Sequence, residues 1–405
     1  MCTLQIVLLS APLALVLLSI AFMPLICESF WSKYEAAILS SLAGVSIILT
    51  VSGIDCFREI LHSTIVDDYI PFIIMLFTLY TLIHGIRIDI LAKATPMNNV
   101  IFLAAGSVIA SFIGTTGASI LLFRPFLEMN KHREKKAHLV VFFIFLVSNI
   151  GGLLTPLGDP PLLLGFIHGV DFFWCLQNLF SSWAIYVSSC LTILYLVDRH
   201  IIKKELNNVI TEPFSLKITG MFHIFLTCVA VIVLFLSFKY SSIVLLLLSG
   251  ISIINARKKH EVDVLLFKNV AVTFFVIFVT MAPVIFILNE HSDAIHLITG
   301  TSARTYFWLC GAASFFLDNA PSYLLFFNLT GESAHNLMHV QPVLLKAISL
   351  GAVVMGSMTY IGNAPNLMIR SLAIKAGIEM PTFIGYIGWA SLVILPISII
   401  ITLFM

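Results

Sequence analysis

The stretch that decides the fold reads Asp318-Asn319-Ala320-Pro321-Ser322-Tyr323-Leu324-Leu325-Phe326. A related stretch lies 203 residues earlier and reads Thr115-Thr116-Gly117-Ala118-Ser119-Ile120-Leu121-Leu122-Phe123. A second pair follows at a displacement of 204 residues, with Thr155-Pro156-Leu157-Gly158-Asp159-Pro160-Pro161 matching Thr359-Tyr360-Ile361-Gly362-Asn363-Ala364-Pro365. Matched polar segments broken by Gly and Pro, in corresponding halves of an apolar chain, indicate a solute-binding site between two repeats. The pattern therefore predicts a chain that carries a solute across a membrane.

The composition places most of the surface in contact with lipid. The chain is 59% hydrophobic and 11% charged, with a mean hydropathy of +1.03. A soluble domain carries about 25% charged residues. The net charge of +1 carries no information on nucleic acid, and no basic cluster is large enough to suggest it, so we predict no nucleic-acid partner. The seven Cys form no CxxC pair, and we interpret them as small apolar residues of helices.

Apolar runs predict an all-α integral membrane protein. Ten runs are long enough to span, near residues 4–26, 35–53, 69–86, 139–165, 172–197, 218–238, 241–256, 268–288, 343–370 and 382–404. Two more, 98–125 and 305–329, are interrupted by polar residues near the middle. These two are either ordinary spans or re-entrant hairpins, whose irregular tips are tolerated where they line a cavity.

The distribution of Lys and Arg favours the hairpins. If both interrupted runs return to the side from which they entered, 18 of the 22 basic residues lie on the cytoplasmic face. If both runs span, the division becomes 15 against 7. The positive-inside rule prefers the first arrangement.

Hairpins also define the domain organisation. The first repeat covers residues 1–197, with its hairpin at 98–125 and a broken helix at 139–165. The second covers 218–405, with its hairpin at 305–329 and a broken helix at 343–370. Residues 198–217 form a cytoplasmic linker. Each repeat crosses the membrane five times, so the second is inverted relative to the first. Both termini are then predicted to be extracytoplasmic, in a multi-pass protein of the cell (inner or plasma) membrane.

Four polar segments are predicted to meet near the membrane midplane, at the two hairpin tips and the two helix breaks. Half-helix ends expose unpaired N–H and C=O groups, and Asn, Ser and Thr add neutral oxygens. Close packing of helices also explains any one of these small residues. The candidate binding residues are Thr115, Thr116 and Ser119, then Ser148, Asn149, Thr155 and Asp159, then Asp318, Asn319 and Ser322, and finally Thr359 and Asn363.

Two acids lie within these apolar segments. A carboxylate at bilayer depth costs roughly 2.5–3.5 kcal/mol, so it needs a partner or a function. Asp318 suits a group that alternately binds a proton and a metal cation, and it also suits an N-cap. Asp159 offers the same two interpretations. We predict Na+ binding at Asp318, Asn149 and Asn363, and no cofactor besides the transported Na+ and H+.

The motifs resemble a known family. They are Ser148-Asn149-x-Gly-Gly-x-x-Thr155-Pro-x-Gly158-Asp159-Pro-Pro, Leu317-Asp318-Asn319-Ala-Pro321 and Thr359-Tyr-Ile-Gly362-Asn363-x-Pro365-Asn366. They are similar to those of the ion transporter superfamily, in the branch of NhaD-type Na+/H+ antiporters and citrate transporters. The resemblance implies inverted repeats, a homodimer and elevator-like movement. Dicarboxylate symporters of this superfamily carry Ser-Asn-Thr at each tip, and here the tips read Thr115-Thr116-Gly117 and Asp318-Asn319-Ala320.

These observations favour a secondary antiporter that exchanges Na+ or Li+ for H+ at a midplane site of carboxylates and amides. The pocket is predicted to hold acids and amides but no Lys or Arg, which suits a cation. Anion sites made by helix ends leave little trace in a sequence, so a Na+- or H+-coupled citrate or dicarboxylate carrier is the alternative. Arsenite extrusion is a third hypothesis. No HExxH or Gly-x-Ser-x-Gly is present, and we predict no enzyme.

Overall fold

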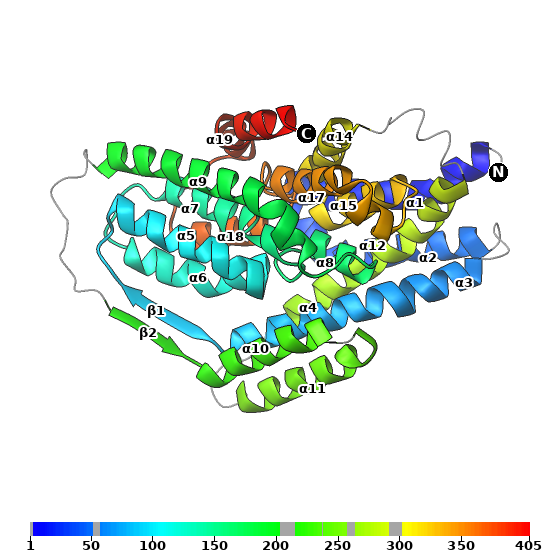
Figure 1. The fold of residues 1–405 in the computed structure, drawn as a ribbon, viewed down its shortest axis with the longest axis horizontal. Coiled ribbons are helices and arrows are strands. Elements are labelled where there is room, and N and C mark those ends of the chain that lie inside the picture. The colour runs from blue at the N-terminus through cyan, green and yellow to red at the C-terminus, as the bar shows by residue number, and fades with distance from the viewer. Residues whose placement is uncertain (1–2, 52–56, 203–214, 237, 257–263, 291–301) are drawn as a thin grey trace.

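The computed structural model describes residues 3–51, 57–202, 215–236, 238–256, 264–290 and 302–405, and the described chain is mostly helical (Figure 1). Seven described helices are long and apolar enough to cross a membrane. Large apolar side chains on these and shorter helices, such as Ile48, Phe225 and Leu392, are exposed and must face lipid. The chain is therefore a multi-pass, all-α membrane protein.

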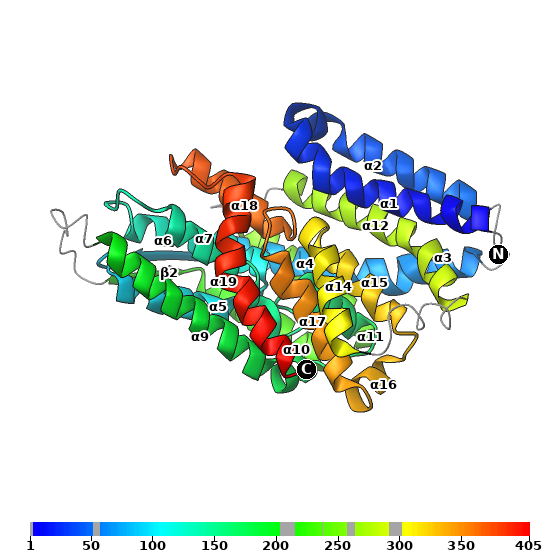
Figure 2. The same ribbon diagram turned by 90° about the horizontal axis from the view of Figure 1, so that it is seen from above.

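One group of helices, here called the flanking bundle, packs mainly against itself. In the first half it contains α1 (Thr3–Ile26), α2 (Glu28–Val51), α3 (Phe57–Ser63), the π-helical turn η1 (Thr64–Tyr69) and α4 (Ile70–His84). In the second half it contains α10 (Met221–Leu236), α11 (Phe238–Ala256) and α12 (Val264–Glu290). Helix α12 packs on α1 and α2, and α4 packs on α10 and α11. Figure 2 shows α1, α2 and α12 side by side, away from α9.

The remaining helices form what we call the central unit. Its first half contains α5 (Pro96–Ile113), α6 (Thr115–Met129), α7 (Ala137–Leu146), the 3-10 turn η2 (Ile150–Leu154), α8 (Pro160–Ile167) and α9 (Trp174–Ile202). Its second half contains α14 (Ala303–Phe316), α15 (Asn319–Leu329), α16 (Ala334–His339), α17 (Pro342–Gly356), α18 (Ala364–Lys375) and α19 (Phe383–Leu403). Residues 138–146 of α7 and most of α17 are buried, so these two helices form the core.

Both interrupted runs consist of two helices that pack against each other. Helices α5 and α6 meet at Gly114, whose φ of 83° is a conformation that favours glycine. Helices α14 and α15 meet at Leu317 and Asp318. The runs 139–165 and 343–370 are likewise broken, between α7 and α8 and between α17 and α18. The opposite orientation of the two halves in the membrane stays a prediction.

Three features were not predicted. An antiparallel ribbon joins β1 (Arg87–Leu91) to β2 (Ser215–Thr219), with Asp89 opposite Lys217. The strands form because both alternate polar and branched apolar residues and pair opposite charges across the ribbon. The third predicted span, 69–86, begins earlier, at Phe57, and passes through the π-helical turn. Helix α9 extends to Ile202, into the predicted linker 198–217, of which residues 203–214 lie outside the described chain.

Candidate functional site

Four helices of the central unit begin at one place. Helix α6 starts at Thr115, whose backbone N–H donates to the Gly158 carbonyl at 2.7 Å, just before α8. Helices α15 and α18 start beside them. Asn319, the first residue of α15, and Asn363, the N-cap of α18, both donate to the carboxylate of Asp159. Gly or Pro stands at three of these four starts, and α15 follows the pair Leu317 and Asp318. Because a helix N-terminus carries about half a positive charge, four partial positive charges converge here around the carboxylates.

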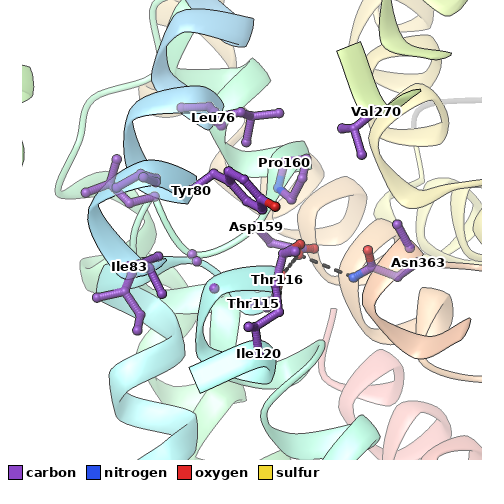
Figure 3. Close-up of a pocket in the computed structure, with 18 of the residues that line it drawn as sticks. Leu76, Tyr80, Ile83, Thr115, Thr116, Ile120, Asp159, Pro160, Val270 and Asn363 are labelled. Carbon is purple, nitrogen blue, oxygen red and sulfur yellow. Dashed lines mark hydrogen bonds between the residues drawn. The ribbon is translucent and has the colours of Figure 1, made fainter. Parts of the chain in front are cut away.

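Asp159 is the centre of this arrangement. Its carboxylate accepts hydrogen bonds from the Thr115 hydroxyl at 2.6 Å, from Asn319 Nδ2 at 2.5 Å and from Asn363 Nδ2 at 3.3 Å. Asp159 is 1% exposed. Figure 3 shows Thr115 and Asn363 on either side of Asp159. Donors from three other helices thus compensate a charge that would otherwise be costly to bury.

A chain of amides continues from Asp159 into the core. Asn363 Nδ2 also donates to Asn149 Oδ1 and to the Ser148 carbonyl, both at 3.1 Å. Asn149 Nδ2 donates to Asn366 Oδ1 at 2.7 Å. Asn366, in turn, donates to the carbonyls of Gly356 and Thr359, at 3.0 and 2.9 Å. Each amide is thereby fixed in one orientation, which presets the position of the carboxylate it supports.

Asn366 was missing from the predicted site, although it ends the third motif. Its i+3 spacing from Asn363 placed both on one face of a helix start, which is the signal that could have found it.

Asp318 takes the capping position that its sequence allowed. It is the N-cap of α15, where its carboxylate accepts from the Ala320 N–H at 3.1 Å and from the Ala364 N–H of α18. The predicted set of Asp318, Asn149 and Asn363 is therefore joined only in part. The two amides bond to each other, and the carboxylate that they approach is that of Asp159. Asp318 lines the same cavity as Asp159.

One oxygen of this site lacks a donor. Asn319 Oδ1 is buried, and none of the described residues donates a hydrogen bond to it. An unpaired buried amide oxygen is costly, and it is also a ligand that hard cations accept. The described residues contain no cluster of three His, Cys, Asp or Glu, so a cation here would rely on amide, hydroxyl and carboxylate oxygens.

Several predicted residues hold the chain breaks and do not line the cavity. Thr155 Oγ1 donates to the Ser111 carbonyl, and Thr359 Oγ1 donates to the Phe315 carbonyl at 2.8 Å. Ser119 and Ser148 share a hydrogen bond at 2.7 Å, and Ser322 donates to the Asp318 carbonyl at 3.0 Å. Thr116 does line the cavity, near Thr115 (Figure 3).

The cavity, of about 110 Å³, lies between the central unit and the flanking bundle. This volume holds several water molecules. Its polar wall contains Thr115, Thr116, Asp159, Asp318 and Asn363. Its opposite wall comes from α4 and α12 and is mostly apolar, with Leu76, Ile83, Val270 and Phe274 among its residues, and Tyr80 and His84 beside them. No Lys or Arg in the described part of the chain lines it.

Comparison with known families places nearly the whole chain in one of them. Residues 3–405 match a family described as "Putative citrate transport". The chain belongs to this family. The assignment is consistent with the resemblance to the ion transporter superfamily, and it makes the protein a secondary transporter of the membrane. No curated protein matches the chain.

Proposed function

We propose that this transporter carries citrate, or a related small carboxylate, together with Na+ or H+. The observation that carries the proposal is the open start of α6 beside two carboxylates. The family description supports the same cargo. The sequence favoured cation exchange because the predicted pocket held acids and amides but no Lys or Arg. The structure distinguishes the helix starts and leaves that of α6 without a capping side chain.

The start of α6 differs from the other three. Its N-cap is Gly114, which makes no side-chain hydrogen bond to the helix. Thr116 and Gly117 stand in the first turn, where N–H groups have no acceptor within the helix, and both line the cavity. A carboxylate of the substrate can accept from these groups.

The other helix starts are already occupied. The carboxylate of Asp318 caps α15 and also accepts from the Ala364 N–H at the start of α18. Helix α8 begins with Pro160 and Pro161, which have no N–H to offer. One helix of the four is therefore available to an anion from the cavity.

The acids assign a second role to the site. A polycarboxylate in a cavity without Lys or Arg needs a co-bound cation to offset its charge. Asp159 and Asp318 line the cavity and can bind Na+ or H+. The buried, unpaired Asn319 Oδ1 can add a further ligand for Na+. Binding of the cation then favours binding of the anion, which couples the two fluxes.

Movement of the central unit against the flanking bundle would expose the site alternately to the two sides. The apolar wall from α4 and α12 supports this elevator-like movement, because it makes few polar contacts with the site that would have to break.

The second candidate is Na+(Li+)/H+ exchange, which the sequence favoured. One observation supports it: two carboxylates face one cavity with no basic side chain on the described wall. In that scheme the acids exchange a proton for a cation, and no carboxylate is carried.

One experiment tests the proposal and separates the candidates. Purified protein in proteoliposomes is given labelled citrate with a Na+ gradient, a pH gradient or neither. We expect citrate uptake that requires one of these gradients and is lost in Asp159→Asn. Release of a pH gradient by Na+ or Li+, without citrate uptake under any gradient, would reject carboxylate transport in favour of exchange.

A further inference from the structure

A second hollow lies beside the central cavity. It measures about 460 Å³ and lies between α6 and the C-terminal part of α18. Its wall combines apolar residues of both helices with four charged residues, Arg124, Glu128, Lys131 and Lys136. Ile120 lines both this hollow and the central cavity, so one side chain lies between them.

One face of α6 connects the two spaces. Thr116, Ile120 and Arg124 follow each other at intervals of four residues, which places them in one row along the helix. Thr116 belongs to the central cavity, Ile120 to both spaces and Arg124 to the hollow. Helix α18 packs against α6 and spans the same two spaces, because Asn363 before its start lines the central cavity and Leu372 near its end lines the hollow.

The charge of the hollow favours anions. Three cationic side chains and one carboxylate line it. Glu128 pairs with Lys131 at 3.1 Å, and Lys136 Nζ donates to the Lys131 carbonyl at 2.9 Å. The balance stays positive, and a concave surface of one sign concentrates the opposite ion. The central cavity has the reverse character, with two acids and no Lys or Arg among its described residues.

We propose that this hollow is the entrance for the anionic solute on the side that the positive-inside rule assigns to the cytoplasm. Arg124 binds a carboxylate of the solute first, and Ile120 is the barrier before the start of α6. Because a β-branched side chain has one strongly preferred χ1 in a helix, passage requires α6 and α18 to separate rather than Ile120 to rotate. The inference rests on the proposed carriage of a carboxylate.

The test measures citrate entry from the face that bears residues 131–136. The orientation of the protein in the vesicles is determined from whether added trypsin cleaves that loop. Arg124→Gln should raise the KM for citrate from this face about fivefold, as expected for one partly exposed ion pair, and leave kcat and the KM from the other face unchanged. The increase should shrink in high salt, because salt screens exposed charges. Lys135→Gln, in the same loop but outside the hollow, is the matched control and should behave as wild type.

The proposed barrier is tested by changing the size of the side chain at position 120. Ile120→Trp should slow citrate entry from this face at least about tenfold, and Ile120→Ala should speed it. The Ala variant keeps the test valid if the Trp variant does not fold.

Three results would overturn the inference. Wild-type kinetics in Arg124→Gln and both Ile120 variants would show that the solute enters elsewhere, while citrate transport itself stands. A KM effect seen in vesicles with anionic lipid but absent from pure phosphatidylcholine would assign the hollow to a lipid headgroup. Wild-type protein that moves no citrate would remove the proposed function, and the entrance with it.

Discussion

The two helix breaks share one backbone design and differ in their charge. In each, a Thr at the break donates to a carbonyl 44 residues earlier, from Thr155 to Ser111 and from Thr359 to Phe315. In each, two glycines six residues apart touch, Gly152 with Gly158 and Gly356 with Gly362. The residue that follows is an acid in the first half and an amide in the second.

The acids are therefore placed differently in the two halves. The first half carries its acid on the broken helix, at Asp159, and leaves the start of its hairpin helix α6 without a side-chain cap. The second half carries its acid on the hairpin, at Asp318, and has the amide Asn363 at the broken helix. A repeated backbone thus supplies the geometry, and differences at two positions supply a site with one uncapped helix start and two carboxylates.

Among the substitutions that remove a difference between the two halves, Asp159→Asn is expected to have the largest effect. The variant makes the first half resemble the second and directs an amide NH2 at the donors Asn319 and Asn363. We expect loss of more than about 100-fold in citrate uptake, with the protein still present in the membrane. Uptake by proteoliposomes and quantitative immunoblotting measure the two quantities. Near-normal uptake would show that transport does not need the charge of Asp159.

A double substitution exchanges the acid and the amide between the two helix breaks. Asp159→Asn combined with Asn363→Asp moves the acid to the equivalent position of the other half, within the same network of hydrogen bonds. We expect part of the cation-dependent uptake to return relative to Asp159→Asn alone. A double variant as inactive as the single one would mean that the two breaks are not interchangeable.

Asp318→Asn removes the acid from the second half only. The N-cap of α15 survives this change, because Asn is an equally good cap. We therefore expect normal membrane levels and loss of the Na+ or H+ requirement together with most of the uptake. An unchanged dependence on the cation gradient would restrict coupling to Asp159.

The shared glycine contacts predict a loss of stability. A Cβ at Gly158 would lie 2.1 Å from the Gly152 carbonyl oxygen, and one at Gly362 would lie 2.6 Å from the Gly356 oxygen. Both Ala variants should unfold at a lower temperature than wild type. The larger effect is expected for Gly158→Ala, whose free energy of unfolding should fall by about 3 kcal/mol or more. Gly44→Ala is the control, because nothing lies within 4 Å of its added Cβ, and it should be neutral or stabilising. Thermal unfolding in detergent measures all three, and equal melting temperatures would contradict the packing.

The smallest effect concerns the outer ends of the hairpins. Thr95 caps α5 by accepting from the Asn98 N–H, whereas Ser302 makes no side-chain bond at the start of α14. Thr95→Ala should cost about 1 kcal/mol and Ser302→Ala close to none. The same melting measurement tests this, and an equal loss from both substitutions would show that the caps are not the cause.

The sequence was sufficient to locate the breaks and much of the site, for physical reasons. Gly and Pro cluster with polar residues at the breaks, and the same clusters recur at an offset of 203–204 residues, which indicated a repeated feature. The choice of Asp318 as the central carboxylate rested on its apolar surroundings alone. Which acid meets Asn319 and Asn363 depends on how four helices pack, and no local pattern encodes that.

Other features were beyond the sequence for the same reason. The uncapped start of α6 differs from its neighbours only when Asp318 is seen to serve two helices. The row from Thr116 to Arg124 acquires meaning only beside α18. The ribbon of β1 and β2 pairs segments more than a hundred residues apart, and each is too short to be recognised alone.

Co-transport of citrate and a cation predicts a mutual effect of the two ligands on binding. Citrate affinity is measured by calorimetry on purified protein with and without Na+, and Na+ affinity with and without citrate. We predict that each ligand strengthens the other by the same factor, because both occupy one site and linkage is reciprocal. Citrate that fails to bind under either condition, while Na+ binding releases protons, would contradict the account and establish a cation exchanger.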